Sequence, residues 1–178
     1  MNAFERLGLE PRYAIDLAAV EKAYRELQRQ MHPDRFAKAD AKTRMHAAAR
    51  AIELNDAYRI VRDPLRRAEE LLRLRGVIFA ETSGPKVSPA FLSEVLDLRE
   101  ALADAKSAGD VARVTAQSDD VRSRYGAAEC DLTEALGDPR GDVGRLADSF
   151  VRLKYFHRFL EEADAILADA LDAGAAER

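Results

Sequence analysis

Apolar residues recur along the chain at alternating steps of three and four, a spacing that predicts amphipathic helices and no strands. In the first 75 residues this pattern and its breaks predict four helices, over residues 3–7, 16–31, 42–62 and 63–75. The second helix shows one apolar stripe, which comprises Leu17, Val20, Tyr24, Leu27 and Met31. The third helix carries its apolar residues at Met45, Ala48, Ile52, Tyr58 and Val61.

The two halves of the chain are separated by residues 76–88, which lack periodicity and are interrupted by glycine and proline. Three longer helices follow, and the capping residues Ser88 and Asp110 mark the starts of the first two. Short turns between long helices favour an antiparallel bundle. We therefore predict an all-α fold, with a helical hairpin domain over 1–75, a linker over 76–88 and a three-helix bundle over 89–178.

Composition and charge narrow the class of protein. Apolar residues make up 47% of the chain and charged residues 34%, which favours a soluble globular protein with a core. A net charge of −4 disfavours a dedicated DNA-binding protein. The single cysteine excludes an internal disulfide, and no Cys/His cluster has metal-ligand spacing. Apolar runs are too short to cross a bilayer and no signal-peptide pattern is present, so a cytoplasmic protein is expected.

A tripeptide between two of the predicted helices, His32-Pro33-Asp34, carries the first resemblance to a known family. Tyr24 lies in a Lys-Ala-Tyr-Arg-x-Leu run before it, and Tyr58 ends an Asn-x-Ala-Tyr run after it. Together these motifs resemble J-domains, the co-chaperone modules that stimulate ATP hydrolysis by DnaK-type heat-shock chaperones. The resemblance implies that residues 1–75 form a J-domain and that the tripeptide contacts the chaperone.

The remainder of the chain resembles one branch of these co-chaperones. The run from Asp63 to Glu69 and the pattern Phe91-Leu92, Leu96, Leu98-Arg99-Glu100 and Leu102 are similar to HscB, the iron–sulfur assembly co-chaperone. The Gly/Phe-rich linker and zinc repeats of general DnaJ proteins are missing, as are the Cys-x-x-Cys pairs of eukaryotic relatives. A bacterial cytoplasmic member of the HscB family fits best. The resemblance implies that the bundle binds the iron–sulfur scaffold protein IscU.

Two departures from the family pattern concern the expected binding surfaces. Glu21 and Glu26 stand where many J-domains have further basic residues, so the positive face of the second helix is thinner. Ser93 stands where family members can present a larger apolar residue, which reduces the expected scaffold-binding patch.

Basic residues on the second helix are the candidates for chaperone binding. Lys22, Arg25 and Arg29 are spaced three and four apart and share a face away from the apolar stripe. An ordinary solvated face is the alternative, and Glu21 lies close to Arg25 on the same helix. Beside His32-Pro33-Asp34, this face is expected to dock an acidic partner and to steer its approach. His32 has no nucleophile or fixed carboxylate array near it, so recognition rather than catalysis is expected.

The helix after Pro89 carries two apolar stripes. Phe91, Val95, Leu98 and Leu102 step as a bundle core requires, whereas Leu92 and Leu96 lie about 100° further around the helix. A wide core face is one explanation of the second stripe. Under the family resemblance it is an exposed patch that holds the scaffold, formed by Leu92, Leu96, Asp97, Arg99, Glu100, Asp104 and, on the last helix, Tyr155. Phe156 is the alternative aromatic residue.

The sequence therefore predicts a non-enzymatic adaptor without cofactor or metal, which recruits IscU to an HscA/DnaK-type chaperone and stimulates its ATPase. A specialised J-domain protein that delivers a different client is the first alternative. A helical DNA-binding regulator is disfavoured by the net charge, and a small helical enzyme by the lack of a catalytic constellation. No nucleic acid or membrane is expected as a partner.

Overall fold

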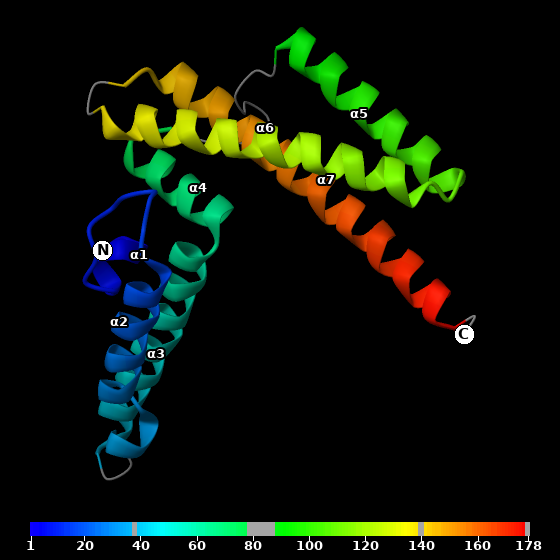
Figure 1. The fold of residues 1–178 in the computed structure, drawn as a ribbon. Helices are drawn as coiled ribbons and strands as arrows, with labels where there is room; N and C mark the ends of the chain where they lie inside the picture. The colour runs from blue at the N-terminus through cyan, green and yellow to red at the C-terminus, as the bar shows by residue number, and fades with distance from the viewer. Residues whose placement is uncertain (37–38, 78–87, 139–140, 177–178) are drawn as a thin grey trace. The chain divides into compact units, whose positions relative to one another are not determined.

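The computed structural model of the 178-residue chain describes residues 1–36, 39–77, 88–138 and 141–176. All regular elements in these ranges are helices, which confirms the predicted all-α class (Figure 1). In chain order they are α1 (Ala3–Arg6), α2 (Leu17–Gln30), the 3₁₀ helix η1 (Pro33–Phe36), α3 (Ala41–Arg62), α4 (Pro64–Leu74), α5 (Pro89–Ser107), α6 (Val111–Gly137) and α7 (Val143–Ala176).

Side-chain caps set most helix starts where the sequence places them. The Asp16 carboxylate accepts the Ala18 backbone N–H at 2.9 Å at the start of α2. Ser88 accepts the Phe91 N–H at 3.2 Å at the start of α5, and Asp110 caps α6. These caps satisfy backbone donors that have no partner within the first helical turn.

The loop after α2 differs from the sequence-based expectation. Its first part forms η1, and α3, capped by Asp40, begins at Ala41, one residue before the expected start. The Thr43 backbone N–H and hydroxyl both donate to the Asp40 carboxylate at 2.8 Å. These hydrogen bonds hold the pKa of the Asp40 carboxyl below its usual range.

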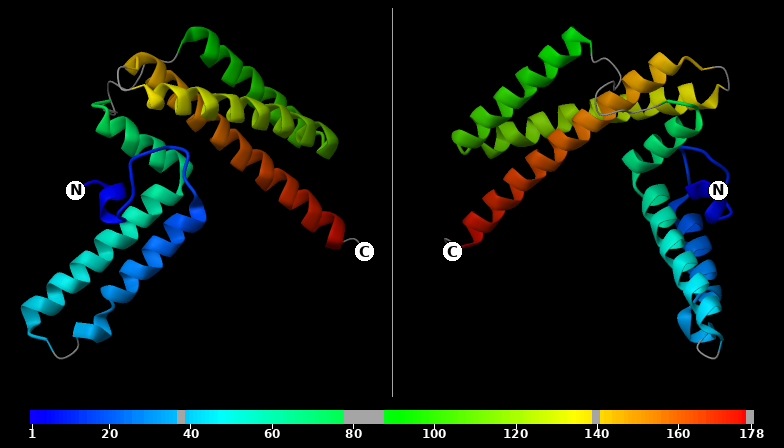
Figure 2. Two further views of the ribbon diagram at one scale, coloured as in Figure 1. Left: turned by 60° about the vertical axis from the view of Figure 1, so that its left-hand side comes forward. Right: turned by 180° about the vertical axis from the view of Figure 1, so that it is seen from behind.

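Residues Met1–Val77 form one compact unit, in which α2 and α3 lie side by side and antiparallel (Figures 1 and 2). The rings of Tyr24 on α2 and Tyr58 on α3 stack with their centroids 4.1 Å apart, and the Tyr24 hydroxyl donates to Asn55 at 2.9 Å. The main buried side chains of this unit are Phe4, Leu7, Val20, Leu54, Val61, Leu71 and Leu72.

Three of the predicted apolar residues of α3 are not in the core, because Ala48 is exposed as well as Met45 and Ile52. Met45 is 70% exposed and Ile52 is 63% exposed, whereas Ala47 and Leu54 are buried. Met45 and Ile52 each precede a buried residue by two positions, about 200° around the helix. The sequence pattern mixes both sides of α3, and only contacts with neighbouring helices decide which side is covered. Leu17, the first residue of α2, is also exposed, against the predicted stripe.

The second unit contains the three long helices α5, α6 and α7 (Figure 2). Gly109 has a φ of +64°, which allows the tight turn between α5 and α6. The buried cluster that these helices share comprises Phe91, Val95, Leu102, Ala105, Val114, Val121, Phe156, Phe159 and Ala163. The predicted core stripe of α5 is therefore confirmed, with Leu98 partly buried beside this cluster.

Helix α1 is tied to α4 through one carboxylate. Glu70 accepts the Ala3 backbone N–H at 3.1 Å and two Arg73 guanidinium hydrogen bonds at 2.9 and 3.0 Å. The Arg73 hydrogen bonds, helped by the Ala3 N–H, lower the pKa of the Glu70 carboxyl although partial burial opposes them. The ionised carboxylate is therefore the form that holds the two ends of this unit together.

Replacing Glu70 by glutamine is expected to lower the melting temperature at neutral pH. Because the folded state lowers its pKa, ionised Glu70 contributes stability that is complete above the pKa of the unfolded chain and is lost as pH falls through the folded value. The difference between wild type and Glu70→Gln should therefore narrow below about pH 5. The exposed neighbour Glu69, changed to glutamine, is the control. A wild-type advantage that stayed constant down to about pH 3 would contradict this role.

Candidate functional site

The basic face of α2, defined as Lys22, Arg25 and Arg29, is exposed as its spacing predicts. Arg25 forms an ion pair with Glu21 at 2.5 Å, and the Arg29 Nε donates to the Arg25 carbonyl oxygen at 3.3 Å. Glu21 therefore offsets part of the charge, as the departure from the family pattern indicates. Val20 is buried on the opposite side of the helix.

The loop that follows α2 begins with the exposed residue His32. The His32 carbonyl oxygen accepts the Arg35 backbone N–H at 3.0 Å, which closes the turn at η1. Pro33 and Asp34 belong to η1, and their side chains lie outside the described part of the structure. The backbone thus places the tripeptide directly beyond the last turn of α2, after the basic face.

The second candidate surface lies on α5. Leu92 is 45% exposed and Leu96 is 54% exposed, while Phe91 and Val95 beside them are buried. The explanation that these leucines widen the core is therefore wrong. Asp97, Glu100 and Asp104 are exposed further around α5, on the side away from the core stripe. An exposed apolar strip with an acidic border results.

The two candidate aromatic residues of α7 have different environments. Phe156 is 3% exposed and packs edge-on against Phe91, with the ring centroids 5.7 Å apart. Tyr155 also contacts the Phe91 ring, at 5.8 Å, but remains half-buried. Of the two, Tyr155 is therefore the residue that can also contribute to a surface.

A small hollow between α5 and α7 brings Arg99 and Tyr155 together. Arg158 also lines it, although the sequence analysis does not single this residue out. The available signal is its position three residues after Tyr155, which places both on one face of α7. Arg99 and Arg158 thus form a basic border on this side of the exposed strip of Leu92 and Leu96. The acidic border described above lies on the other side of that strip.

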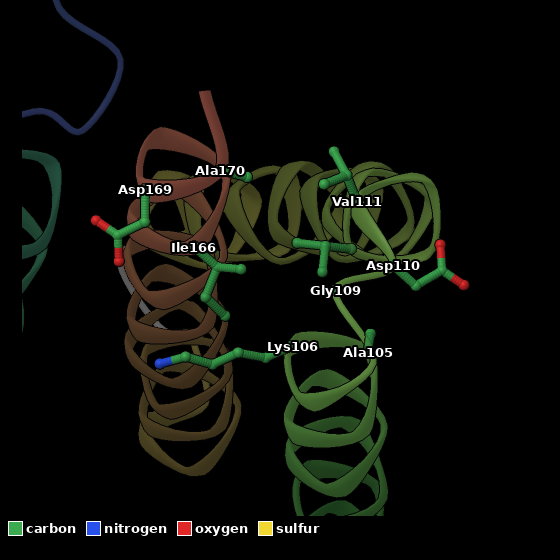
Figure 3. Close-up of a pocket in the computed structure, with 9 residues that line it drawn as sticks. Ala105, Lys106, Gly109, Asp110, Val111, Ile166, Asp169 and Ala170 are labelled. Carbon is green, nitrogen blue, oxygen red and sulfur yellow. The ribbon is translucent and has the colours of Figure 1, made fainter. Parts of the chain in front are cut away.

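Another hollow, of about 230 Å³, lies where the turn between α5 and α6 meets α7 (Figure 3). Its floor is mainly apolar, and Lys106 reaches towards α7 while the Asp169 carboxylate points away from α5 (Figure 3). This arrangement offers no pair of acid and base and no activated nucleophile. Among the residues that the structure describes, no three metal-ligating side chains gather into a site.

The described residues include no candidate for a membrane-spanning helix. None of their helices combines the length with the apolar composition needed to cross a bilayer.

Comparisons with known proteins match both halves of the chain. Residues 2–69 match the DnaJ domain family, and residues 87–164 match the family described as the HSCB C-terminal oligomerisation domain. A co-chaperone protein HscB homolog of Aeromonas hydrophila is 38% identical, over 92% of this chain and 95% of that protein. A homolog with the same name in Shewanella sp. strain MR-4 is 33% identical, over 97% of this chain and 100% of its own length.

Solved structures show the same architecture. Chaperone HscB from Vibrio cholerae superposes with a TM-score of 0.82 at 31% identity, covering 96% of this chain and 99% of that one. Human co-chaperone protein HscB has a TM-score of 0.83 at 22% identity, covering 93% of this chain and 81% of the human chain, and so shares the fold.

The DnaJ domain at the amino terminus places the chain in the class of J-domain co-chaperones. Within that class, the matches over nearly the full length of several relatives identify the branch. The chain belongs to the HscB co-chaperone family.

Proposed function

We propose that this protein recruits an IscU-type iron–sulfur scaffold to an HscA/DnaK-type chaperone in the cytoplasm and stimulates the ATPase of that chaperone. Membership of the HscB family supports the co-chaperone part of this proposal. We further propose that residues 1–75 act as the J-domain, 76–88 as the linker and 89–178 as the scaffold-binding bundle. Most of the proposed linker, residues 78–87, lies outside the described residues.

For the chaperone contact, we assign the tripeptide His32-Pro33-Asp34 and the basic face of α2. The exposed ammonium and guanidinium groups can attract an acidic surface and set its register, since such charges act mainly on encounter and specificity. The proline ring limits the conformations of the loop and so lowers the entropic cost of ordering it on a partner.

The exposed strip on α5 is the observation that carries the scaffold assignment. Leu92 and Leu96 expose about half of their surface beside a well-packed core, so these two side chains are not needed to fill that core. We assign the scaffold contact to Leu92, Leu96, Asp97, Arg99, Glu100, Asp104 and Tyr155. Apolar anchors with a polar border are the usual composition of a specific protein interface. Ser93, exposed on the same helix, adds no apolar area to the patch.

Titration of the protein with a purified IscU-type scaffold in a calorimeter tests this function. Saturable binding with one scaffold per chain is expected. Absence of binding, together with intact stimulation of the chaperone, would indicate a J-domain protein with a different client.

Replacing Arg25 by alanine is expected to weaken association with the chaperone several-fold, by about 0.5–1 kcal/mol, because the exposed charge already has a partner in Glu21. Wild-type association should also weaken as ionic strength rises, since salt screens exposed charges. Surface plasmon resonance at several salt concentrations measures both effects, with the exposed Arg50→Ala on α3 as the control. Association that is independent of salt would indicate an apolar contact instead.

A further inference from the structure

Three arginines line one hollow where α3 ends and α4 begins, a place found in Figure 1 between the two helix labels. The hollow has a volume of about 490 Å³, and its lining residues are Arg59, Arg62, Asp63 and Arg66. All three arginine side chains are exposed. We call this group of four residues the arginine hollow.

The charges of the arginine hollow do not balance. Among the described residues, no ion pair joins Arg59, Arg62 or Arg66 to a carboxylate. Asp63 is the one acidic residue in its lining, and its carboxylate accepts the Arg66 backbone N–H at 2.9 Å as the cap of α4. Three positive charges therefore face one negative charge that already serves the helix start.

A fourth arginine adds positive charge beneath this surface. Arg67 is only 8% exposed, and its guanidinium donates to the Val61 and Arg62 carbonyl oxygens at 2.9 and 3.4 Å. The Arg67 Nε has no hydrogen-bond partner, and the guanidinium carbon lies 4.9 Å from the centroid of the Tyr13 ring. No ion pair in the described residues neutralises Arg67. Its charge therefore strengthens the positive potential at the junction of α3 and α4, which we call the elbow.

The arrangement of the arginine hollow is partly preorganised. The Arg62 guanidinium lies over the Tyr58 ring, 5.9 Å from its centroid, and Tyr58 is itself stacked on Tyr24. Pro64, at the first position of α4, stiffens the elbow that sets Arg66 beside the end of α3. Such order lowers the entropic cost of binding a ligand there.

We propose that the arginine hollow binds a compact phosphate-type polyanion. Guanidinium groups form paired hydrogen bonds that match the oxygens of phosphate. The four residues that line the hollow are all charged, so it presents no aromatic or aliphatic residue as an anchor of the kind that peptide recognition uses. The hollow is separate from the His32-Pro33-Asp34 loop of the proposed chaperone contact, because the 22 residues of α3 place about 33 Å between that loop and the junction of α3 with α4.

Calorimetric titration of the full chain with tripolyphosphate at low salt tests the proposal. Saturable binding is expected, and the double variant Arg59→Gln/Arg66→Gln should weaken it by about tenfold or more, since each lost charge-assisted bond weakens affinity. The control is Arg44→Gln/Arg50→Gln, which removes the same charge from exposed positions of α3 outside the hollow. It should change the affinity by less than about twofold. Circular dichroism verifies that both variants keep their helices.

Two further ligands, ATP and a hexaglutamate peptide, are compared with tripolyphosphate. ATP shows whether a nucleotide is preferred to free polyphosphate, and the peptide shows whether carboxylates can replace phosphate. ATP should bind about as tightly as tripolyphosphate, because nothing in the lining recognises a base. A hexaglutamate peptide should bind at least about tenfold more weakly, since carboxylates carry less charge at each site. Absence of saturable tripolyphosphate binding, equal losses in the two double variants, or tighter binding of ATP or the peptide would each overturn the proposal.

Discussion

A chain in which Leu92 and Leu96 are both replaced by alanine is expected to bind the scaffold about 30- to 100-fold more weakly and to melt close to the wild-type temperature. The loss of affinity follows if these two leucines are the apolar anchors of the interface, because a few such residues usually contribute most of the binding free energy. The unchanged stability follows from their exposure, 45% and 54%, in the free protein.

A buried leucine of the same helix provides the control. Leu102 is 1% exposed, so Leu102→Ala should lower the free energy of unfolding by about 2–5 kcal/mol. Thermal melting and scaffold titration on both variants separate the two roles. A large fall in melting temperature for the double variant would mean that Leu92 and Leu96 stabilise the fold. Normal melting with undiminished scaffold binding would place the scaffold surface elsewhere.

Replacing His32 by glutamine, or Asp34 by asparagine, is expected to reduce stimulation of the chaperone ATPase to less than about a tenth. Asp34 can accept charge-assisted hydrogen bonds from a partner arginine, and asparagine removes that charge at almost constant size. His32 is exposed beside η1, so its replacement should leave the helical content unchanged.

Steady-state ATP hydrolysis and circular dichroism on each variant measure both effects. The control is His46→Gln, which makes the same change at an exposed position of α3. Full stimulation by the His32 or Asp34 variant would contradict the assignment of the tripeptide as the chaperone contact. Early melting of either variant would show that the residue has a structural role instead.

Helix type and many helix limits could be predicted from the sequence because they depend on local chemistry. Asp16, Asp63 and Ser88 each accept a backbone N–H of the helix that they begin, and proline follows the latter two directly. These signals act within one turn and need no knowledge of the rest of the fold.

The side of a helix that becomes buried could be predicted only in part. On α5, the core stripe and the exposed strip differ by one position, and the bundle contacts leave Leu92 and Leu96 outside the core. On α3, Met45 and Ile52 fit a helical apolar pattern equally well but are exposed, because α1, α2 and α4 pack against the side that carries Ala47 and Leu54. Tertiary contacts decide which side of these helices is buried, and such contacts cannot be inferred from the pattern of a single sequence.

The arginine hollow illustrates the same limit. Arg59, Arg62 and Arg66 appear in the sequence as ordinary charged positions near a proline. The structure shows that they line one hollow at the junction of α3 and α4, where Arg67 is buried and donates to the Val61 carbonyl oxygen. The tripeptide that we assign to the chaperone contact, by contrast, is contiguous in sequence and can be found without a structure.

If one chain connects a scaffold to the chaperone, the scaffold and this protein should act on the chaperone jointly. The measurement is the ATP hydrolysis rate of a DnaK-type chaperone with this protein alone, with an IscU-type scaffold alone, and with both. Both together are expected to accelerate hydrolysis more than the sum of their separate effects, and Leu92→Ala/Leu96→Ala should remove only this excess. A rate that the scaffold leaves unchanged in the presence of the wild-type protein would contradict this expectation.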